Sequence, residues 1–175
     1  MNIVIINGSH RVNGNCYAFS RYFKGEFGDS NKVDIINLIE SNMLPCNGCL
    51  ICEEGEECGI NDDFSTSMKH LLEEADLLIF ATPTYFNMPS GDMVHFLDRT
   101  NCLCDYFTNN HKKCFAYLTG QTDEETIMEA YKCLSSYFEI MEMDEIASPI
   151  INVVRMPEEL SEDVKTKIHE IMDML

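Results

Sequence analysis

The chain has 175 residues and carries 30 acidic against 12 basic side chains, which gives a formal net charge of −18 at pH 7. A charge of this sign and size repels the phosphates of nucleic acids and of anionic membranes, so we expect no nucleic-acid and no membrane partner. Apolar residues make up 45% of the chain and charged residues 24%, which is ordinary globular usage. The length suits a single domain, residues 1–175, with one sizeable core.

The sequence carries no recognisable targeting or membrane-spanning signal. No stretch is long and apolar enough to cross a membrane, and the first residues already belong to a predicted strand rather than to a signal peptide. These features favour a cytoplasmic protein. In a reducing compartment the nine cysteines predict no disulfide framework. Their thiols are then available for metal, cluster or redox chemistry, or they pack in the core.

The opening stretch predicts a strand, a tight turn and a helix. Residues 3–6 are a β-branched run of buried-strand length, and a helix-like segment follows from about Tyr17 to Phe27. Between them, residues 7–16 read Asn-Gly-Ser-His-Arg-Val-Asn-Gly-Asn-Cys. This arrangement gathers unpaired backbone N–H groups and the positive end of a helix at one point, which favours binding of an anion.

The side chains of this loop suit a phosphate. Gly8 allows a tight turn and a close approach of the backbone to a ligand. Ser9, Asn13 and Asn15 add hydrogen-bond donors, and the Arg11 guanidinium can grip phosphate oxygens by two parallel bonds. We therefore interpret the loop as a phosphate-binding loop. The alternative is an ordinary turn in which Ser9 or Asn13 merely caps the helix.

Two well-known phosphate loops are excluded by the residues present. The dinucleotide pattern needs a second glycine at position 10, where this chain has His10. The Walker pattern needs Gly-Lys-Ser/Thr, whereas residues 13–15 read Asn-Gly-Asn.

Apolar runs and turn signals predict five strands that alternate with five helices. Such a pattern predicts a parallel sheet with both faces covered, in which ligands lie beyond the carboxyl ends of the strands. The loops after the first, third and fourth strands are therefore expected to meet in space. The strands are expected at 3–6, 32–38, 77–81, 114–119 and 146–154 (bent near Pro149), and the helices at 17–27, 62–74, 91–101, 123–138 and 158–175.

The loop after the third predicted strand is rich in aromatic and apolar residues. Pro83 and Pro89 stiffen it, and Tyr85 and Phe86 can lie against the face of a flat conjugated ring. A phosphate-binding loop beside such an aromatic surface suggests a mononucleotide cofactor. The alternative is that Tyr85 and Phe86 pack in the core under a long connection.

Three segments together resemble the NAD(P)H-dependent FMN reductases of the flavodoxin-like superfamily. They are residues 8–15 (Gly-Ser-His-Arg-Val-Asn-Gly-Asn), 83–88 (Pro-Thr-Tyr-Phe-Asn-Met) and 96–99 (Phe-Leu-Asp-Arg). The resemblance covers roughly the first two-thirds of the chain. It implies a flavodoxin-like three-layer sandwich with a five-stranded parallel sheet in the order 2-1-3-4-5 and helices on both faces. It also implies a homodimer or homotetramer, and a structural ion pair between Asp98 and Arg99.

The resemblance implies FMN as the cofactor and assigns its contacts. Cys16 departs from the family pattern, in which Thr or Ser is commoner, and a thiol is a poorer donor than a hydroxyl. The residues implied to hold the FMN phosphate are Ser9, Arg11, Asn13, Asn15 and Cys16. Those implied to hold the isoalloxazine ring are Pro83, Thr84, Tyr85, Phe86, Asn87 and Met88, with the loop of Thr119, Gly120 and Gln121 bordering it from the other side.

The implied activity is that of the cofactor, which the protein orients. NAD(P)H is the expected electron donor, and the expected acceptor is small: a quinone, a nitro compound or a free flavin. No side chain is expected to act as acid or base. Two other classes stay open: an electron carrier that serves a redox protein, and a non-redox nucleotide-binding module of the same fold.

Four cysteines lie close together in the predicted loop of residues 41–62. Cys46, Cys49, Cys52 and Cys58 could ligate an iron–sulfur cluster. Their compact spacing resembles that of the iron–sulfur flavoproteins of the same superfamily, which implies a [4Fe–4S] cluster. Zinc sites normally separate their cysteine pairs by more residues. The alternative is a cluster-free loop whose thiols line the active site or act in redox exchange, and the acidic run at 53–57 favours it.

Overall fold

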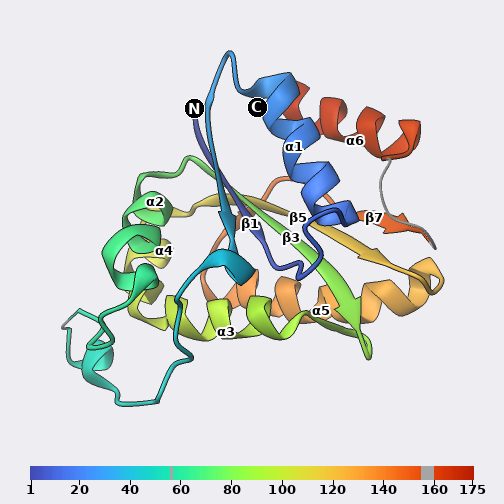
Figure 1. The fold of residues 1–175 in the computed structure, drawn as a ribbon. Helices are drawn as coiled ribbons and strands as arrows, with labels where there is room; N and C mark the ends of the chain where they lie inside the picture. Colours follow the sequence, from blue (N-terminus) through green and yellow to red (C-terminus); the bar gives the residue numbers. More distant parts are fainter. Residues whose placement is uncertain (56, 155–159) are drawn as a thin grey trace.

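The computed structural model describes residues 1–55, 57–154 and 160–175 (Figure 1). Its centre is a parallel sheet in which β1 (Asn2–Asn7) lies between β2 (Lys32–Asn37) and β3 (Leu77–Tyr85). On its other side β3 pairs with β5 (Lys113–Gly120), and β5 pairs with β7 (Ile150–Val153). The order β2-β1-β3-β5-β7 confirms the expected arrangement of five positions in the sheet.

The described residues form seven strands rather than the expected five. The fifth predicted strand is divided, because β6 (Asp144–Glu145) pairs with the start of β5 and β7 pairs with its end. Pro149 lies between the two pieces, where its missing N–H interrupts a ladder. The other additional strand is β4 (Met88–Pro89), which pairs antiparallel with the end of β3.

Helices cover both faces of the sheet (Figure 1). α1 (Asn15–Phe27) and α6 (Glu162–Asp173) pack on one face. On the other face lie a π-helical turn η3 (Phe64–Met68) with α2 (Lys69–Glu74), then α3 (Gly91–Arg99), α4 (Cys104–Asn110) and α5 (Glu124–Ile140). Three short 3-10 turns complete the chain: η1 (Leu38–Glu40), η2 (Ile51–Glu54) and η4 (Thr100–Leu103). The expected start of the last helix at Glu158 lies outside the described residues.

The core is divided into two clusters by the pleat of the sheet. In β1, Ile3 and Ile5 face α1 and α6, whereas Val4 and Ile6 face the helices of the other side. Both sets are buried, since a strand in the middle of a parallel sheet is covered on both faces. Burial of each such side chain contributes roughly 1.5–3 kcal/mol. This double burial explains why the strands appear in the sequence as continuous apolar runs.

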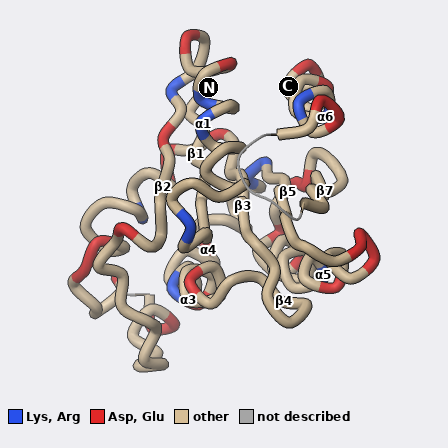
Figure 2. Tube along the Cα trace, turned by 45° about the vertical axis from the view of Figure 1, so that its right-hand side comes forward, with Lys and Arg blue, Asp and Glu red and all other residues tan. Residues whose placement is uncertain are grey.

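Acidic residues are distributed over the loops and along α5 and α6 (Figure 2). In the described part of the chain, no helix has both the length and the apolar character that crossing a membrane requires.

The long connection between β2 and η3 is held to the rest of the molecule by Arg99, which is only 2% exposed. Its guanidinium donates hydrogen bonds to the Leu44 carbonyl oxygen at 2.7 Å and to both carboxylate oxygens of Asp62, with Nη2 3.0 Å from Oδ1. Asp62 in turn accepts from the N–H groups of Leu44 and Phe64. The expected pairing of Arg99 with Asp98 is therefore wrong. Asp98 is exposed, and the buried partner comes from 37 residues earlier in the chain.

We expect Asp62→Asn to lower the free energy of unfolding by about 3–5 kcal/mol, because it leaves the Arg99 charge buried without its counter-ion. Urea denaturation followed by circular dichroism measures the change. The control is Glu129→Gln, which removes an exposed ion pair with Lys132 and should cost less than about 1 kcal/mol. Equal losses in the two variants would contradict this assignment.

The same pair sets an acid limit on stability. Burial opposes the charged form of Asp62, but the Arg99 guanidinium and the N–H groups of Leu44 and Ser65 outweigh it and hold the pKa of Asp62 below its ordinary value. The folded pKa lies below the unfolded value of about 3.9, so the stabilisation is complete above that pH and is lost as the pH falls through the folded pKa. Unfolding of Asp62→Asn should depend less on pH in that acid range than unfolding of the unmodified chain.

β5 approaches β3 closely at Gly120. A Cβ atom there would lie 2.5 Å from Thr84 Oγ1 and 3.0 Å from Ile127 Cγ1. Gly120→Ala should therefore destabilise the fold by about 1–3 kcal/mol. In contrast, Gly25 in α1 has nothing within 4 Å of the corresponding position, so Gly25→Ala should stabilise the fold by about 0.5–1 kcal/mol. Thermal unfolding of both variants measures the two opposite signs, and equal signs would contradict the packing argument.

Candidate functional site

A cavity of about 280 Å³, called here the strand-end cavity, opens beyond the carboxyl ends of β1, β3 and β5. Its walls come from the loop after β1, the turn between β3 and β4, and the segment after β5, as the sheet topology predicts. It is lined by Ser9, Arg11, Gly14, Asn15, Pro83, Thr84, Tyr85, Phe86, Asn87, Thr119, Gly120, Gln121, Thr122 and Val154.

Most of the sequence-predicted flavin contacts meet in this cavity, and three do not. Asn13 and Met88 are exposed and are not part of the lining. Cys16 is fully buried in the core beneath α1, where burial raises the pKa of its thiol far above the ordinary value. Only its backbone N–H, in the first turn of α1, is placed to serve a ligand.

Three lining residues were missed from the sequence: Gly14, Thr122 and Val154. Val154 follows β7, and a signal for it existed. The fifth strand of a parallel sheet ends at the same edge as the others, so the residue after it belongs to the same rim.

The loop after β1 uses several of its own amides internally. The Gly8 N–H donates to the Ala81 carbonyl oxygen at 2.9 Å, and the Ser9 N–H donates to Asn7 Oδ1 at 3.0 Å. The Arg11 N–H donates to Ser9 Oγ at 3.1 Å. The N–H groups at the start of α1 remain for an anion. Gly14, the N-cap of that helix, has no side chain with which to satisfy them.

Asn15 carries a buried polar atom that a ligand can satisfy. Its Nδ2 donates to Thr119 Oγ1 at 3.4 Å, but its Oδ1 is buried and has no hydrogen-bond partner among the described residues. A buried acceptor without a partner costs about 1–3 kcal/mol. A hydroxyl or N–H group of a molecule in the cavity would remove that cost.

The turn between β3 and β4 is strained and exposed. Phe86 and Asn87 have φ angles of 50° and 60°, as a two-residue hairpin turn with the right twist requires. Asparagine tolerates this conformation, but for phenylalanine it is an outlier. Phe86 is 96% exposed and Tyr85 45% exposed, so the alternative that these rings pack in the core is wrong. The turn is held at its base by the Ser90 N–H, which donates to Thr82 Oγ1 at 3.0 Å.

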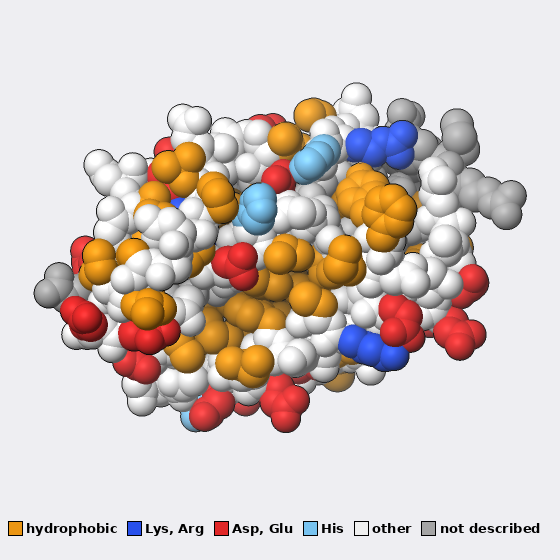
Figure 3. Space-filling model, turned by 90° about the horizontal axis from the view of Figure 1, so that it is seen from below, with side chains coloured by type: hydrophobic (Ala, Val, Ile, Leu, Met, Phe, Trp, Pro, Cys, Tyr) orange, Lys and Arg blue, Asp and Glu red, His pale blue; other side chains and the backbone are white. Residues whose placement is uncertain are grey.

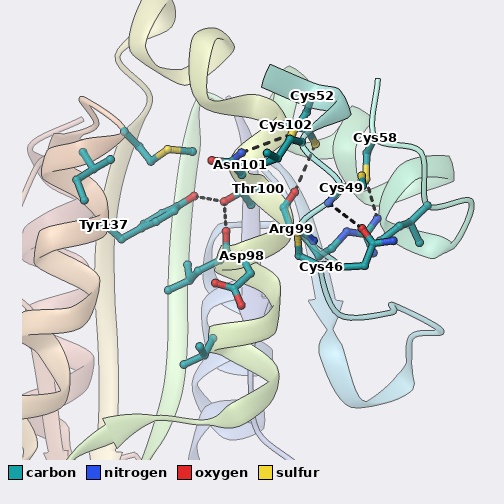
Figure 4. Close-up of a pocket in the computed structure, with 18 of the residues that line it drawn as sticks. Cys46, Cys49, Cys52, Cys58, Asp98, Arg99, Thr100, Asn101, Cys102 and Tyr137 are labelled. Carbon is teal, nitrogen blue, oxygen red and sulfur yellow. Dashed lines mark hydrogen bonds between the residues drawn. The ribbon is translucent and has the colours of Figure 1, made fainter. Parts of the chain in front are cut away.

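A second cavity of about 580 Å³, the cysteine cavity, lies at the carboxyl end of α3. It is lined by Cys46, Cys49, Cys52 and Cys58, together with Cys102 (Figure 4). Among the described residues, no three Cys, His, Asp or Glu side chains are grouped closely enough to hold a metal ion. The structure thus brings the four predicted ligands to one cavity without closing them into a finished site.

The sulfur atoms in this cavity have hydrogen-bond donors beside them. Arg99 Nη2 lies 3.5 Å from Cys58 Sγ, and Asn101 Nδ2 lies 3.5 Å from Cys52 Sγ. Burial opposes the thiolate of Cys58, but hydrogen bonds from the Ile60 N–H and from Arg99 outweigh it and lower the pKa of Cys58. Burial, with Cys58 nearby, raises the pKa of Cys102 to about 11.

The cysteine cavity continues along the groove between α3 and α5. Val94 and Leu97 line it from α3, and Tyr137 and Ile140 line it from α5. Figure 3 shows this side of the molecule, with apolar side chains gathered in the middle of the face and acidic side chains around them.

The sequence is similar to those of known flavoproteins. The family described as NADPH-dependent FMN reductase matches residues 1–156. The chain is 31% identical over 136 residues to an iron-sulfur flavoprotein of Methanocaldococcus jannaschii, an alignment that covers 75% of this chain and 70% of the relative. It is 30% identical over 125 residues to an iron-sulfur flavoprotein of Clostridioides difficile, covering 68% of this chain but only 54% of that relative.

Solved structures show the same fold. A flavodoxin, WrbA-like protein from Agrobacterium tumefaciens superposes with a TM-score of 0.68 at 15% identity, covering 98% of this chain and 93% of that one. Oxidised flavodoxin 1 from Bacillus cereus superposes with a TM-score of 0.62 at 14% identity, covering 99% and 98%. The fold is therefore flavodoxin-like, and the chain belongs to the NADPH-dependent FMN reductase family of flavin-dependent oxidoreductases.

Proposed function

We propose that the chain holds FMN in the strand-end cavity, takes electrons from NAD(P)H and passes them to a small acceptor such as a quinone, a nitro compound or a free flavin. The observation that carries the proposal is the buried Asn15 Oδ1, which lacks a partner within the described residues and lies in the wall of this cavity. The hydroxyl-bearing chain of FMN offers donors for it.

The proposed phosphate site is the start of α1. Its first-turn N–H groups have no intrahelical acceptors, and the helix end carries a partial positive charge. Ser9 Oγ is held beside them by the Arg11 N–H, and the Arg11 side chain lines the same cavity. A phosphate dianion is the ligand that this combination suits.

The proposed ring site is the turn between β3 and β4. The exposed rings of Tyr85 and Phe86 supply aromatic surface, and Thr84 and Asn87 supply polar groups at its edge. Thr119 and Gly120 form the opposite wall.

The redox chemistry is that of FMN, which when bound accepts a hydride from a nicotinamide and returns electrons to a second substrate. The chain's own residues bind and orient. Arg11 and the start of α1 neutralise the phosphate, and the aromatic turn shields one side of the cavity from water. No acid or base is needed among the lining side chains, so we propose no catalytic residue.

A second candidate function is supported by the cysteine cavity: an electron carrier with a [4Fe–4S] cluster on Cys46, Cys49, Cys52 and Cys58. The donor set suits a cluster, because thiolates are its usual ligands and N–H donors beside the sulfurs are the usual surroundings. Four relatives carry the name iron-sulfur flavoprotein. Such a carrier would serve a redox protein rather than a small acceptor.

We also propose that the chain forms a homodimer or homotetramer. Apolar side chains are exposed on several elements, with Ile140 67%, Met88 57% and Leu50 57% exposed. Figure 3 shows apolar side chains gathered in the middle of one face of the molecule, and an exposed apolar patch is typical of an interaction surface. Light scattering after size-exclusion chromatography measures the mass in solution.

The flavin proposal predicts a preference for the phosphate. FMN titrated into the apoprotein should bind more tightly than riboflavin, and Arg11→Met should weaken FMN binding by about 10–100-fold while leaving riboflavin binding nearly unchanged. Quenching of flavin fluorescence measures both constants, and oxidation of NADH and NADPH by the loaded protein tests turnover. Arg21→Met, an exposed position on α1, is the matched control. A chain that takes up no FMN would favour a non-redox nucleotide-binding module.

The cluster proposal predicts iron and sulfide after anaerobic purification. The expected content is about four iron atoms per chain with broad visible absorbance, and Cys49→Ser should abolish both. Cys133→Ser is the control, because Cys133 lines the same cavity from α5 without belonging to the proposed ligand set. Iron-free protein with intact flavin binding would leave the reductase as the sole function, with these thiols as cavity lining.

A further inference from the structure

A chain of side-chain hydrogen bonds runs behind the loop that follows β1. Asn7 is fully buried at the end of β1, and its Oδ1 accepts the Ser9 N–H at 3.0 Å. Its Nδ2 donates to Asn37 Oδ1 at 3.0 Å, at the end of the neighbouring strand β2. Asn37 Nδ2 then donates to Glu40 Oε2 at 2.9 Å. The loop is thus connected through two amides to the carboxylate of η1.

The same carboxylate also holds the start of α1. Tyr17, in the first turn of the helix, is 7% exposed and donates its hydroxyl to Glu40 Oε1 at 3.2 Å. Burial, the hydrogen bond and the charge of Glu40 raise the pKa of Tyr17 to about 12, so the hydroxyl stays a donor at neutral pH. One oxygen of Glu40 therefore accepts from the amides behind the loop, and the other accepts from the first turn of α1.

The direction of these hydrogen bonds explains why an acceptor, Glu40, lies at the end of the hydrogen-bonded series. Asn7 Oδ1 is committed to the Ser9 N–H, so its NH₂ group faces Asn37, and the NH₂ group of Asn37 must face a further acceptor. An ionised carboxylate only accepts, and it offers two oxygens. A leucine or an alanine at this position would leave both donors without this partner and the two amides free to reorient.

The negative charge of Glu40 near the proposed phosphate site requires an explanation. The chain already carries a net charge of −18, and another carboxylate near an anion site weakens binding of that anion by Coulomb repulsion. We propose that Glu40 is a positioning residue for the FMN phosphate: it holds Ser9 through Asn7 and Asn37, and the first turn of α1 through Tyr17, in one fixed arrangement. This inference rests on the proposed function, and it assigns Glu40 no contact with the phosphate.

The test compares the affinities for FMN and riboflavin, because only a phosphate-specific effect changes their ratio. Glu40→Leu should weaken FMN binding about tenfold and riboflavin binding less than about twofold. Glu40→Gln should keep the ratio within about twofold of the unmodified protein, because its oxygen accepts from Asn37 and its NH₂ group donates to the Tyr17 oxygen. Glu139 is also exposed but lies on α5, so Glu139→Leu controls for loss of a surface charge. Fluorescence quenching measures each constant, with circular dichroism as a check of folding.

Several results would overturn the inference. An equal loss of FMN and riboflavin affinity in Glu40→Leu would indicate a general effect on stability. A gain in FMN affinity would indicate that Glu40 only repels the phosphate. An unchanged ratio of the two affinities would likewise contradict the inference. Should Glu40→Leu fail to fold, Tyr17→Phe and Asn37→Ala each remove one arm. Each should then weaken FMN about threefold without affecting riboflavin, and no change in either would overturn the inference.

The outcome for the unmodified chain separates the two proposals. A chain that binds neither flavin overturns the proposed function and this inference with it. A chain that prefers FMN, and keeps that preference in Glu40→Leu, overturns this inference alone.

Discussion

The register of β1 between β2 and β3 is the constraint on which the strand-end cavity depends. In this register Asn7, the last residue of β1, lies opposite Asn37 of β2 and Ala81 of β3. The Gly8 N–H then reaches the Ala81 carbonyl oxygen, and the Asn7 side chain reaches Asn37. A shift by one residue would exchange the two faces of β1, moving Ile3 and Ile5 into the cluster of Val4 and Ile6. The packing of two apolar clusters therefore determines where the loop after β1 begins, and so where Ser9 and α1 stand.

Different interactions hold the chain at the two ends of α3. At its amino end, Ser90 caps the helix, with Oγ 3.2 Å from the Met93 N–H, and its own N–H fastens the turn after β3. The strand-end cavity is thus enclosed by segments that the sheet holds on both sides. At its carboxyl end, one buried ion pair between Arg99 and Asp62 fastens a long connection. The four clustered cysteines lie on that connection, where two left-handed residues, Leu50 and Gly55, bound the turn η2.

Much of this architecture could be predicted from local patterns, and the misses have physical causes. Continuous apolar runs located the strands because a doubly covered parallel sheet needs them. Local patterns do not determine which neighbouring side chains share a face. Asn15 lines the cavity, whereas Cys16, one residue later and about 100° further round the helix, points into the core. The resemblance implied a pair between Arg99 and its neighbour Asp98, and no local pattern indicates that a carboxylate 37 residues earlier lies beside Arg99. The position of Asn37 could have been predicted. It lies at the end of the strand beside β1, opposite Asn7 in the parallel register.

Phe86 combines two features that a stable fold alone would not retain. Its left-handed backbone is strained for a residue with a large side chain, and its ring is 96% exposed to water. Glycine or asparagine would form the same two-residue turn without strain, as Asn87 does beside it. Neither could present an aromatic face at the rim of the cavity, and the antiparallel pairing of Tyr85 with Met88 holds that ring clear of the core. The proposed function gives strain and exposure at this one residue a common explanation, in which the exposed ring contacts the flat ring of FMN.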